Sequence, residues 1–224
     1  MTMQIVERII SNGHGHLDAG YLVIHETANP GATAANHVSY WSNNPNAPMT
    51  HYVADWTDTV YHTVPDDRIC WHVGNGNDRT VGIELCHAVK VTDFLRVWET
   101  GVLFAAWYLN KRGWGIDRLI SHNDARLMWG GTDHTDPAGA DGKSGYFGQF
   151  GRTWEQFKSD VETELAMADI DYQRLADRIV DTFMRYKLTG DNGYTADIGQ
   201  RICRMDDKTQ AIVNSVKNIE KQTK

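Results

Sequence analysis

The alternation of apolar and polar residues predicts short strands in the first half of the chain. Several apolar runs have the length and the β-branched content typical of strands. Two of them flank Trp56–Asp58, a spacing that predicts a hairpin. The runs are Tyr21–His25, His51–Asp55, Thr59–Val64, Val81–Leu85 and Leu119–His122.

Two longer stretches have the 3.6-residue periodicity of amphipathic helices. In the first, Thr92 is a suitable N-cap and Gly113 can end the helix in a left-handed conformation. In the second, Thr153–Gln156 is a capping box. Strands interleaved with helices predict an α/β domain with a mixed central sheet flanked by helices. The inward faces comprise Phe94, Val97, Trp98, Val102, Ala105, Tyr108 and Leu109 in the first helix, and Trp154, Phe157, Val161 and Leu165 in the second.

The composition of the chain changes near residue 168. All ten histidines and all eight tryptophans precede that point. We therefore predict a large domain over residues 1–168 and a small helical module over residues 169–224, with a turn at Gly190–Gly193. The module has two apolar stripes, Tyr172, Leu175, Ala176, Ile179 and Phe183, then Ile212, Val213, Val216 and Ile219.

Charge and composition exclude several classes of protein. The net charge is −7, and no basic stripe of the kind found in nucleic-acid-binding proteins is present. No apolar stretch approaches the ~18 residues of a membrane-spanning helix. The N-terminus lacks the features of a secretory signal, so we expect synthesis in the cytoplasm without membrane insertion. Cys70, Cys86 and Cys203 form no CxxC pair, and we expect reduced, buried thiols.

Three residues are candidates for a catalytic metal site. His25 and His122 each end an apolar run, so a rigid sheet would hold them next to solvent. Asp136 follows in a loop that Gly130 and Gly131 loosen. Two histidines and one carboxylate leave the fourth position of a tetrahedral zinc ion open for water, which is typical of catalytic zinc. A lone histidine is more often structural, and no compact motif such as HExxH is present.

Four motifs make residues 18–166 similar to a known family. In their order along the chain they resemble the zinc N-acetylmuramoyl-L-alanine amidases, which include phage lysins, bacterial cell-wall recycling amidases and animal peptidoglycan recognition proteins. The resemblance implies zinc bound by His25, His122 and Asp136, and a catalytic carboxylate at Glu84. The motifs are Val23–Ala28, Trp71–Gly74 followed by Asn77–Leu85, Ser121–Asp124 and Thr135–Pro137.

The chain departs from these amidases at two positions. Many relatives have a lysine two residues before the third ligand, where this chain has His134. A protonated histidine can stabilise an oxyanion there. Phage and animal relatives have a tyrosine where this chain has Thr50, so Glu84 must act as base without it. By resemblance His72 belongs to the substrate pocket, with simple packing as the alternative.

The resemblance implies hydrolysis of the amide bond between N-acetylmuramic acid and L-alanine in bacterial peptidoglycan. The expected protein is a bacteriolytic endolysin of a phage or prophage that reaches the cell wall after release. Two alternatives stay open, a module that binds peptidoglycan without cutting it and a cytosolic amidase that recycles muropeptides. Residues 169–224 are expected to bind the wall or to form a homodimer through their helices. The glycine-rich run 139–151 is expected to be a mobile loop near the site.

Overall fold

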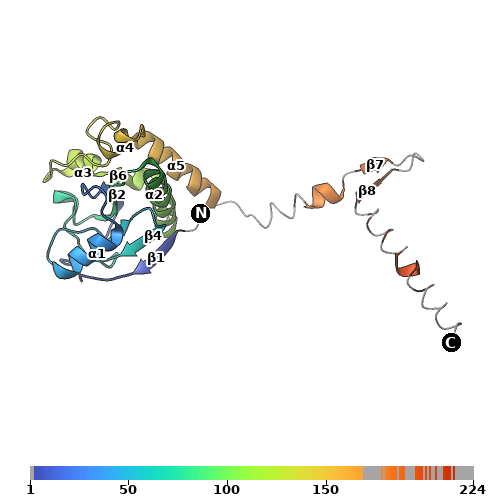
Figure 1. Cartoon of the computed structure of the whole chain (residues 1–224), viewed down its shortest axis with the longest axis horizontal. Coiled ribbons are helices and arrows are strands. Elements are labelled where there is room, and N and C mark those ends of the chain that lie inside the picture. Colours follow the sequence, from blue (N-terminus) through green and yellow to red (C-terminus); the bar gives the residue numbers. More distant parts are fainter. Residues whose placement is uncertain are drawn as a thin grey trace. The chain divides into compact units, whose positions relative to one another are not determined.

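The chain forms two units, Met1–Asp169 and Ile170–Lys224 (Figure 1). The computed structural model describes residues 3–168 and, beyond them, residues 178, 180–185, 187–189, 195–198, 200, 202, 205, 209–212 and 214. Among these residues, no helix combines the length and the apolar character needed to cross a membrane.

A six-stranded sheet forms the centre of the first unit. Its strand order is β1-β4-β3-β5-β2-β6. Strands β3 and β4 form the predicted antiparallel hairpin, and the other neighbouring strands are parallel. The strands are β1 Gln4–Glu7, β2 Tyr21–Glu26, β3 Tyr52–Ala54, β4 Thr59–His62, β5 Thr80–Leu85 and β6 Leu119–Ser121.

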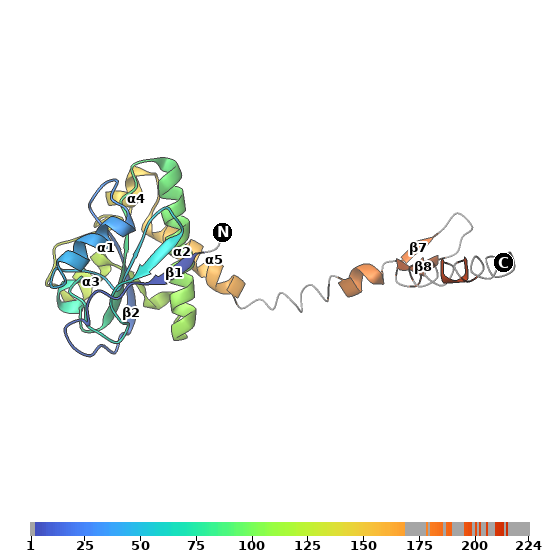
Figure 2. The same cartoon turned by 60° about the horizontal axis from the view of Figure 1, so that its bottom comes forward.

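Helices cover both faces of this sheet (Figure 2). Helices α2 and α5 pack on each other, and α2 covers one face; α1 and α3 lie against the other face. The mixed sheet with helices on both sides confirms the predicted fold class. The helices are α1 Ala34–Asn43, α2 Val91–Arg112, α3 His122–Trp129, α4 Gly145–Gln149 and α5 Trp154–Ala168, with short 3₁₀ turns η1 Gly74–Gly76 and η2 Ile116–Arg118.

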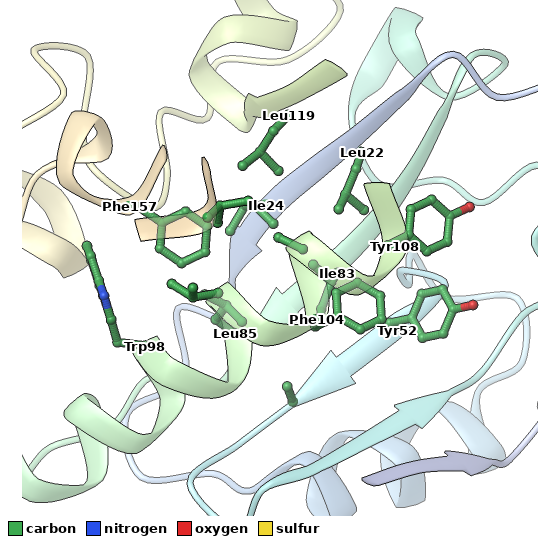
Figure 3. Packing of buried hydrophobic residues seen from close by; sticks show 14 of the residues in the cluster. Leu22, Ile24, Tyr52, Ile83, Leu85, Trp98, Phe104, Tyr108, Leu119 and Phe157 are labelled. Atoms are coloured by element: carbon green, nitrogen blue, oxygen red, sulfur yellow. The ribbon is translucent and has the colours of Figure 1, made fainter. Parts of the chain in front are cut away.

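The period-2 alternation of β-strands gives each face of the sheet its own set of side chains. On the α2 side, alternate residues of β2 and β5 enter the main core. His25 follows Ile24, and Glu84 lies between Ile83 and Leu85, so both project from the opposite face. The main core contains Leu22, Ile24, Ile83, Leu85, Phe104 and Phe157 (Figure 3).

The predicted helices are present, with one correction at a helix start. The N-cap of α2 is Lys90, not Thr92, because the helix begins at Val91. Gly113 ends this helix with φ 64°, as predicted. Thr153 and Gln156 form the predicted capping bonds of α5, in which each backbone N–H donates to the other residue's side chain.

The prediction that His122 ends a strand and precedes a polar turn is wrong. Strand β6 ends at Ser121, whose hydroxyl accepts a hydrogen bond from the Asp124 N–H at 3.0 Å. The Asp124 carboxylate in turn accepts from the Ser121 N–H at 2.8 Å. These reciprocal bonds form a capping box, so His122 is the first residue of α3.

The glycine-rich run 139–151 is not the expected mobile loop. It contains α4, whose Tyr146 and Phe147 are buried. The Tyr146 hydroxyl donates to the Cys86 carbonyl at 3.1 Å and accepts from the Ala88 N–H at 3.0 Å. Cys70 and Cys86 are buried, free thiols, as predicted, whereas Cys203 lies outside the described residues.

The second unit contains a hairpin that the helical interpretation did not include. Strand β7, Lys187–Thr189, pairs antiparallel with β8, Thr195–Asp197. Residues 180–184 and 209–212 are helical. The predicted turn at Gly190–Gly193 lies outside the described residues. From the predicted stripes only Phe183 and Ile212 are described, and both are exposed. The remaining stripe residues, Tyr172, Leu175, Ala176, Ile179, Val213, Val216 and Ile219, also lie outside.

Candidate metal centre and active site

Three side chains from distant parts of the sequence meet near the end of β2. His25 belongs to β2, His122 begins α3, and Asp136 lies in the loop after α3. The Nδ1 atoms of the two histidines are 2.9 Å apart. The Asp136 carboxylate lies 3.0 Å from His122 Nδ1 and 3.4 Å from His25 Nδ1. These two nitrogens and one carboxylate match a zinc donor set in chemistry and in proximity.

Hydrogen bonds from outside the cluster orient each of the three side chains. The Glu26 N–H donates to Asp136 Oδ2 at 3.1 Å. His122 Nε2 lies 2.9 Å from the Thr132 hydroxyl, and His25 Nε2 lies 2.9 Å from His72 Nδ1. Because both Nε2 atoms are occupied in this way, both Nδ1 atoms face the centre of the cluster.

The charge state of Asp136 follows from its two histidine partners. Burial alone would raise the pKa of this carboxyl. The interactions of this carboxyl with His122 and His25 outweigh burial and hold its pKa well below the usual range. Burial lowers the pKa of His25, which keeps its imidazole neutral near pH 7. A carboxylate and a neutral imidazole are the forms that bind a metal ion.

A directional chain of hydrogen bonds runs behind His25. The Thr80 hydroxyl donates to the Gly76 carbonyl at 2.8 Å, so it accepts from His72 Nε2 at 3.2 Å. Burial lowers the pKa of His72 well below its usual value, and a neutral ring that donates from Nε2 must accept at Nδ1. His25 therefore donates from Nε2 to His72, which leaves a lone pair on His25 Nδ1 facing the cluster.

His72 fits against the sheet because β5 has a glycine beneath it. A Cβ atom on Gly82 would lie 2.6 Å from His72 Nδ1. The Gly82 N–H donates to His51 Nδ1 at 3.1 Å, and His51 Nε2 donates to the Arg68 carbonyl at 2.8 Å. Burial lowers the pKa of His51 to about 4, so this histidine is a neutral packing residue.

Glu84 lies beside His25 on the same face of the sheet. The two residues are paired in register between β5 and β2. Glu84 Oε2 is buried and accepts no hydrogen bond from any described residue. Burial raises the pKa of this carboxyl well above its usual value, and the nearby charges of Asp136 and Glu26 raise it further. A carboxyl with a raised pKa beside a cluster of candidate metal ligands is suited to proton transfer.

A pocket of about 400 Å³ opens over the three clustered side chains and Glu84. His72 is among its lining residues, but the ring also contacts His25. His134 lies at the rim with its side chain 69% exposed, and its Nδ1 is 3.9 Å from Asp136 Oδ1. Thr50 is buried, and its hydroxyl donates to the Tyr52 carbonyl. The structure thus brings all six sequence-predicted site residues to one pocket.

Three supporting residues were missed by the sequence analysis. Glu26 and Thr80 fall within quoted motifs, but nothing in the pattern distinguishes them from their neighbours. Thr132 lies outside every motif. Glu26 also pairs with His87 Nδ1 at 2.8 Å, and burial raises the pKa of this carboxyl.

The chain is similar to characterised proteins over most of the first unit. A profile of the N-acetylmuramoyl-L-alanine amidase family matches residues 16–139. The N-acetylmuramoyl-L-alanine amidase CwlA of Bacillus subtilis strain 168 is 29% identical over 177 residues, which cover 74% of this chain and 59% of CwlA. The N-acetylmuramoyl-L-alanine amidase XlyB of the same strain is 32% identical over 155 residues, which cover 66% of this chain and 44% of XlyB. The chain thus spans about half the length of these curated relatives.

Solved structures share the fold at lower sequence identity. The crystal structure of the Staphylococcus aureus hydrolase AmiA in complex with its ligand superposes with a TM-score of 0.65 and 24% identity, covering 76% of this chain and 88% of AmiA. The catalytic domain of XlyA superposes with a TM-score of 0.56 and 22% identity, covering 71% of this chain and 99% of that domain. Both comparisons confirm the predicted fold class.

The close packing of His72 on Gly82 can be tested by substitution. In Gly82→Ala the new methyl group pushes His72 away from His25. Because overpacking a buried site costs energy, we expect a loss of about 1–3 kcal/mol in the free energy of unfolding. Urea unfolding measures this loss. Imidazole ¹⁵N NMR should show the loss of the hydrogen bond between the two rings.

Gly20→Ala is the matched control. A Cβ on Gly20 meets only Arg118 Nη1, at 3.9 Å. This variant should unfold like the wild type. Equal stability of the Gly82 variant and the wild type, with the imidazole signals unchanged, would contradict the close packing of His72 on β5.

Proposed function

Because the chain belongs to the N-acetylmuramoyl-L-alanine amidase family, we propose that it hydrolyses the amide bond between N-acetylmuramic acid and L-alanine in bacterial peptidoglycan. The observation that carries this proposal is the convergence of His25, His122, Asp136 and Glu84 on one pocket. Amide hydrolysis at neutral pH needs an activated water and a group that moves protons. The pocket contains side chains suited to both tasks.

The first task falls to the clustered histidines and Asp136. We assign His25 Nδ1, His122 Nδ1 and Asp136 as the residues that hold zinc, because this donor set leaves a further position for water. When bound, zinc acts as a Lewis acid that lowers the pKa of water and polarises the scissile carbonyl. His72 acts through His25, whose ring it orients by the hydrogen bond at Nε2.

The second task falls to Glu84. Its carboxylate accepts a proton from the attacking water and returns a proton to the nitrogen of the departing L-alanine. The raised pKa helps it to hold that proton between the two steps. His134 at the rim donates a hydrogen bond to the carbonyl oxygen as negative charge develops there.

We assign catalysis to residues 1–168, since every residue with a proposed role lies there. The second unit, with its hairpin β7–β8, is assigned to binding of the cell wall or of a second copy of the chain.

Metal removal tests the first part of the proposal. The purified protein should contain about one zinc per chain. Chelation should abolish hydrolysis of a soluble muropeptide but leave the circular dichroism spectrum nearly unchanged, because the sheet and helices have their own apolar core. Added zinc should restore activity.

The matched pair for this experiment is His25→Ala and His16→Ala. The first variant should lose zinc, whereas the second, at an exposed histidine outside the cluster, should retain it. Undiminished hydrolysis by metal-free protein would refute the assignment of these ligands.

Glu84→Gln tests the second part. Removal of a general base should lower kcat by about 10²–10⁴-fold with zinc still bound. The same change should stabilise the metal-free protein above pH 4.5. The raised pKa means that the folded state keeps a proton that the unfolded chain releases near the ordinary value of 4.5. Wild-type stability therefore falls as pH rises from 4.5 through the raised pKa, and glutamine removes this loss.

Activity assays and thermal unfolding between pH 4 and 8 measure both effects. Glu162→Gln, at an exposed position of α5, is the control and should change neither. Near-normal turnover by the Glu84 variant would mean that another residue acts as the general base.

A further inference from the structure

Trp71 is a large aromatic side chain at the edge of the pocket. It is 48% exposed, although tryptophan is usually well buried. It lines the same pocket as the zinc-ligand candidates and Glu84. The mechanism proposed above gives it no role.

One face of the Trp71 ring is covered by His14. The two rings are stacked, with centroids 3.6 Å apart and planes 5° apart. Since His14 occupies one face and half of the side chain remains exposed, the exposed area belongs largely to the opposite face and the ring edge. One face of the indole ring is therefore stacked on His14, and the other face is accessible.

Backbone hydrogen bonds fix this stack in place. The His14 N–H donates to the Ile69 carbonyl at 2.8 Å, and the Ile69 N–H donates to the Gly15 carbonyl at 3.0 Å. Gly13, at φ 66°, allows the close approach, because a Cβ there would lie 2.7 Å from Arg68 Cβ. After Trp71, the Asn77 side chain accepts from the N–H groups of residues 72 and 73. Hydrogen bonds of the residues before and after Trp71 therefore fix the position of its ring.

The pocket-lining residues that lie close to Trp71 in the sequence are uncharged. They include Val73, Gly74 and Asn77. A pyranose ring is uncharged and presents a flat array of C–H groups on one face. This face packs well against the face of an aromatic ring. The stem peptide of peptidoglycan carries carboxylates and has no large apolar side chain.

We propose that the open face of Trp71 binds a sugar ring of the glycan strand and so fixes the direction in which the substrate lies. The proposal rests on the proposed function and names the part of the substrate that this side of the pocket recognises.

The stem peptide has room in a part of the site that Trp71 does not line. A second hollow of about 380 Å³ adjoins the pocket and shares Thr27, Pro48 and Glu84 with it. It is lined by α1 residues, among them Asn36, His37 and Tyr40, and not by Trp71. The glycan lies over the tryptophan, the scissile amide over the clustered histidines, and the peptide along α1.

Two substrates with the same scissile bond test this arrangement. One is a soluble peptidoglycan fragment with several disaccharide units, and the other is a D-lactyl-L-alanyl peptide without sugar. Trp71→Ala should lower kcat/KM for the glycan substrate about three- to tenfold, mainly through KM. It should leave kcat/KM for the sugar-free peptide within twofold of the wild type. Trp71→Phe should recover most of the loss.

The control is Trp107→Ala, which removes a partly exposed tryptophan of α2 on the far side of the sheet. It should affect neither substrate. Equal losses on both substrates for Trp71→Ala would overturn the proposal, because the residue would then only support the pocket. Unchanged kinetics on the glycan substrate would overturn it as well.

Calorimetry separates failure of this proposal from failure of the proposed function. The probe is a trimer of N-acetylglucosamine, titrated into Glu84→Gln in the millimolar range. Binding should disappear in the double variant with Trp71→Ala and persist with Trp107→Ala. Equal binding to the two double variants, or none to Glu84→Gln alone, would contradict the sugar site whether or not the protein hydrolyses amides.

Discussion

The parallel pairing of β2 with β5 is the constraint on which the candidate site depends. Their register makes His25 and Glu84 direct neighbours, and the period-2 alternation sends both side chains to the face away from α2. A shift of the register by one residue would direct one of them into the apolar core. The core residues Ile24, Ile83 and Leu85 oppose that shift, so the packing of one face positions the chemistry of the other.

Two carboxyls in this pocket, Asp136 and Glu84, have opposite electrostatic environments. Asp136 lies beside two histidines, which hold its pKa down so that it stays ionised. Burial raises the pKa of Glu84, whose Oε2 accepts no hydrogen bond from any described residue. Groups whose pKa values are driven apart in this way can take different roles, one as metal ligand and one as proton carrier. The chain through His72 and Thr80 adds a third element, because it fixes which nitrogen of His25 faces Asp136.

The sequence predicted those residues that a pattern among their neighbours along the chain identifies. Strand periodicity located His25, and the mixed sheet followed from the order of strands and helices. Glu84 depended on resemblance, because a glutamate near a strand end has no distinctive pattern. The capping box at Ser121 was mistaken for a turn, since both begin with polar residues after an apolar run. The stack of His14 on Trp71 joins two loops, and no periodicity predicts such a contact.

We propose that this pocket cuts the bond between N-acetylmuramic acid and L-alanine. Mass spectrometry of purified peptidoglycan after digestion tests it most directly. We expect free stem peptides with a new N-terminal alanine, and glycan strands without new reducing ends. New reducing ends, or cleavage within the peptide while the muramic acid–alanine bond stays intact, would contradict it.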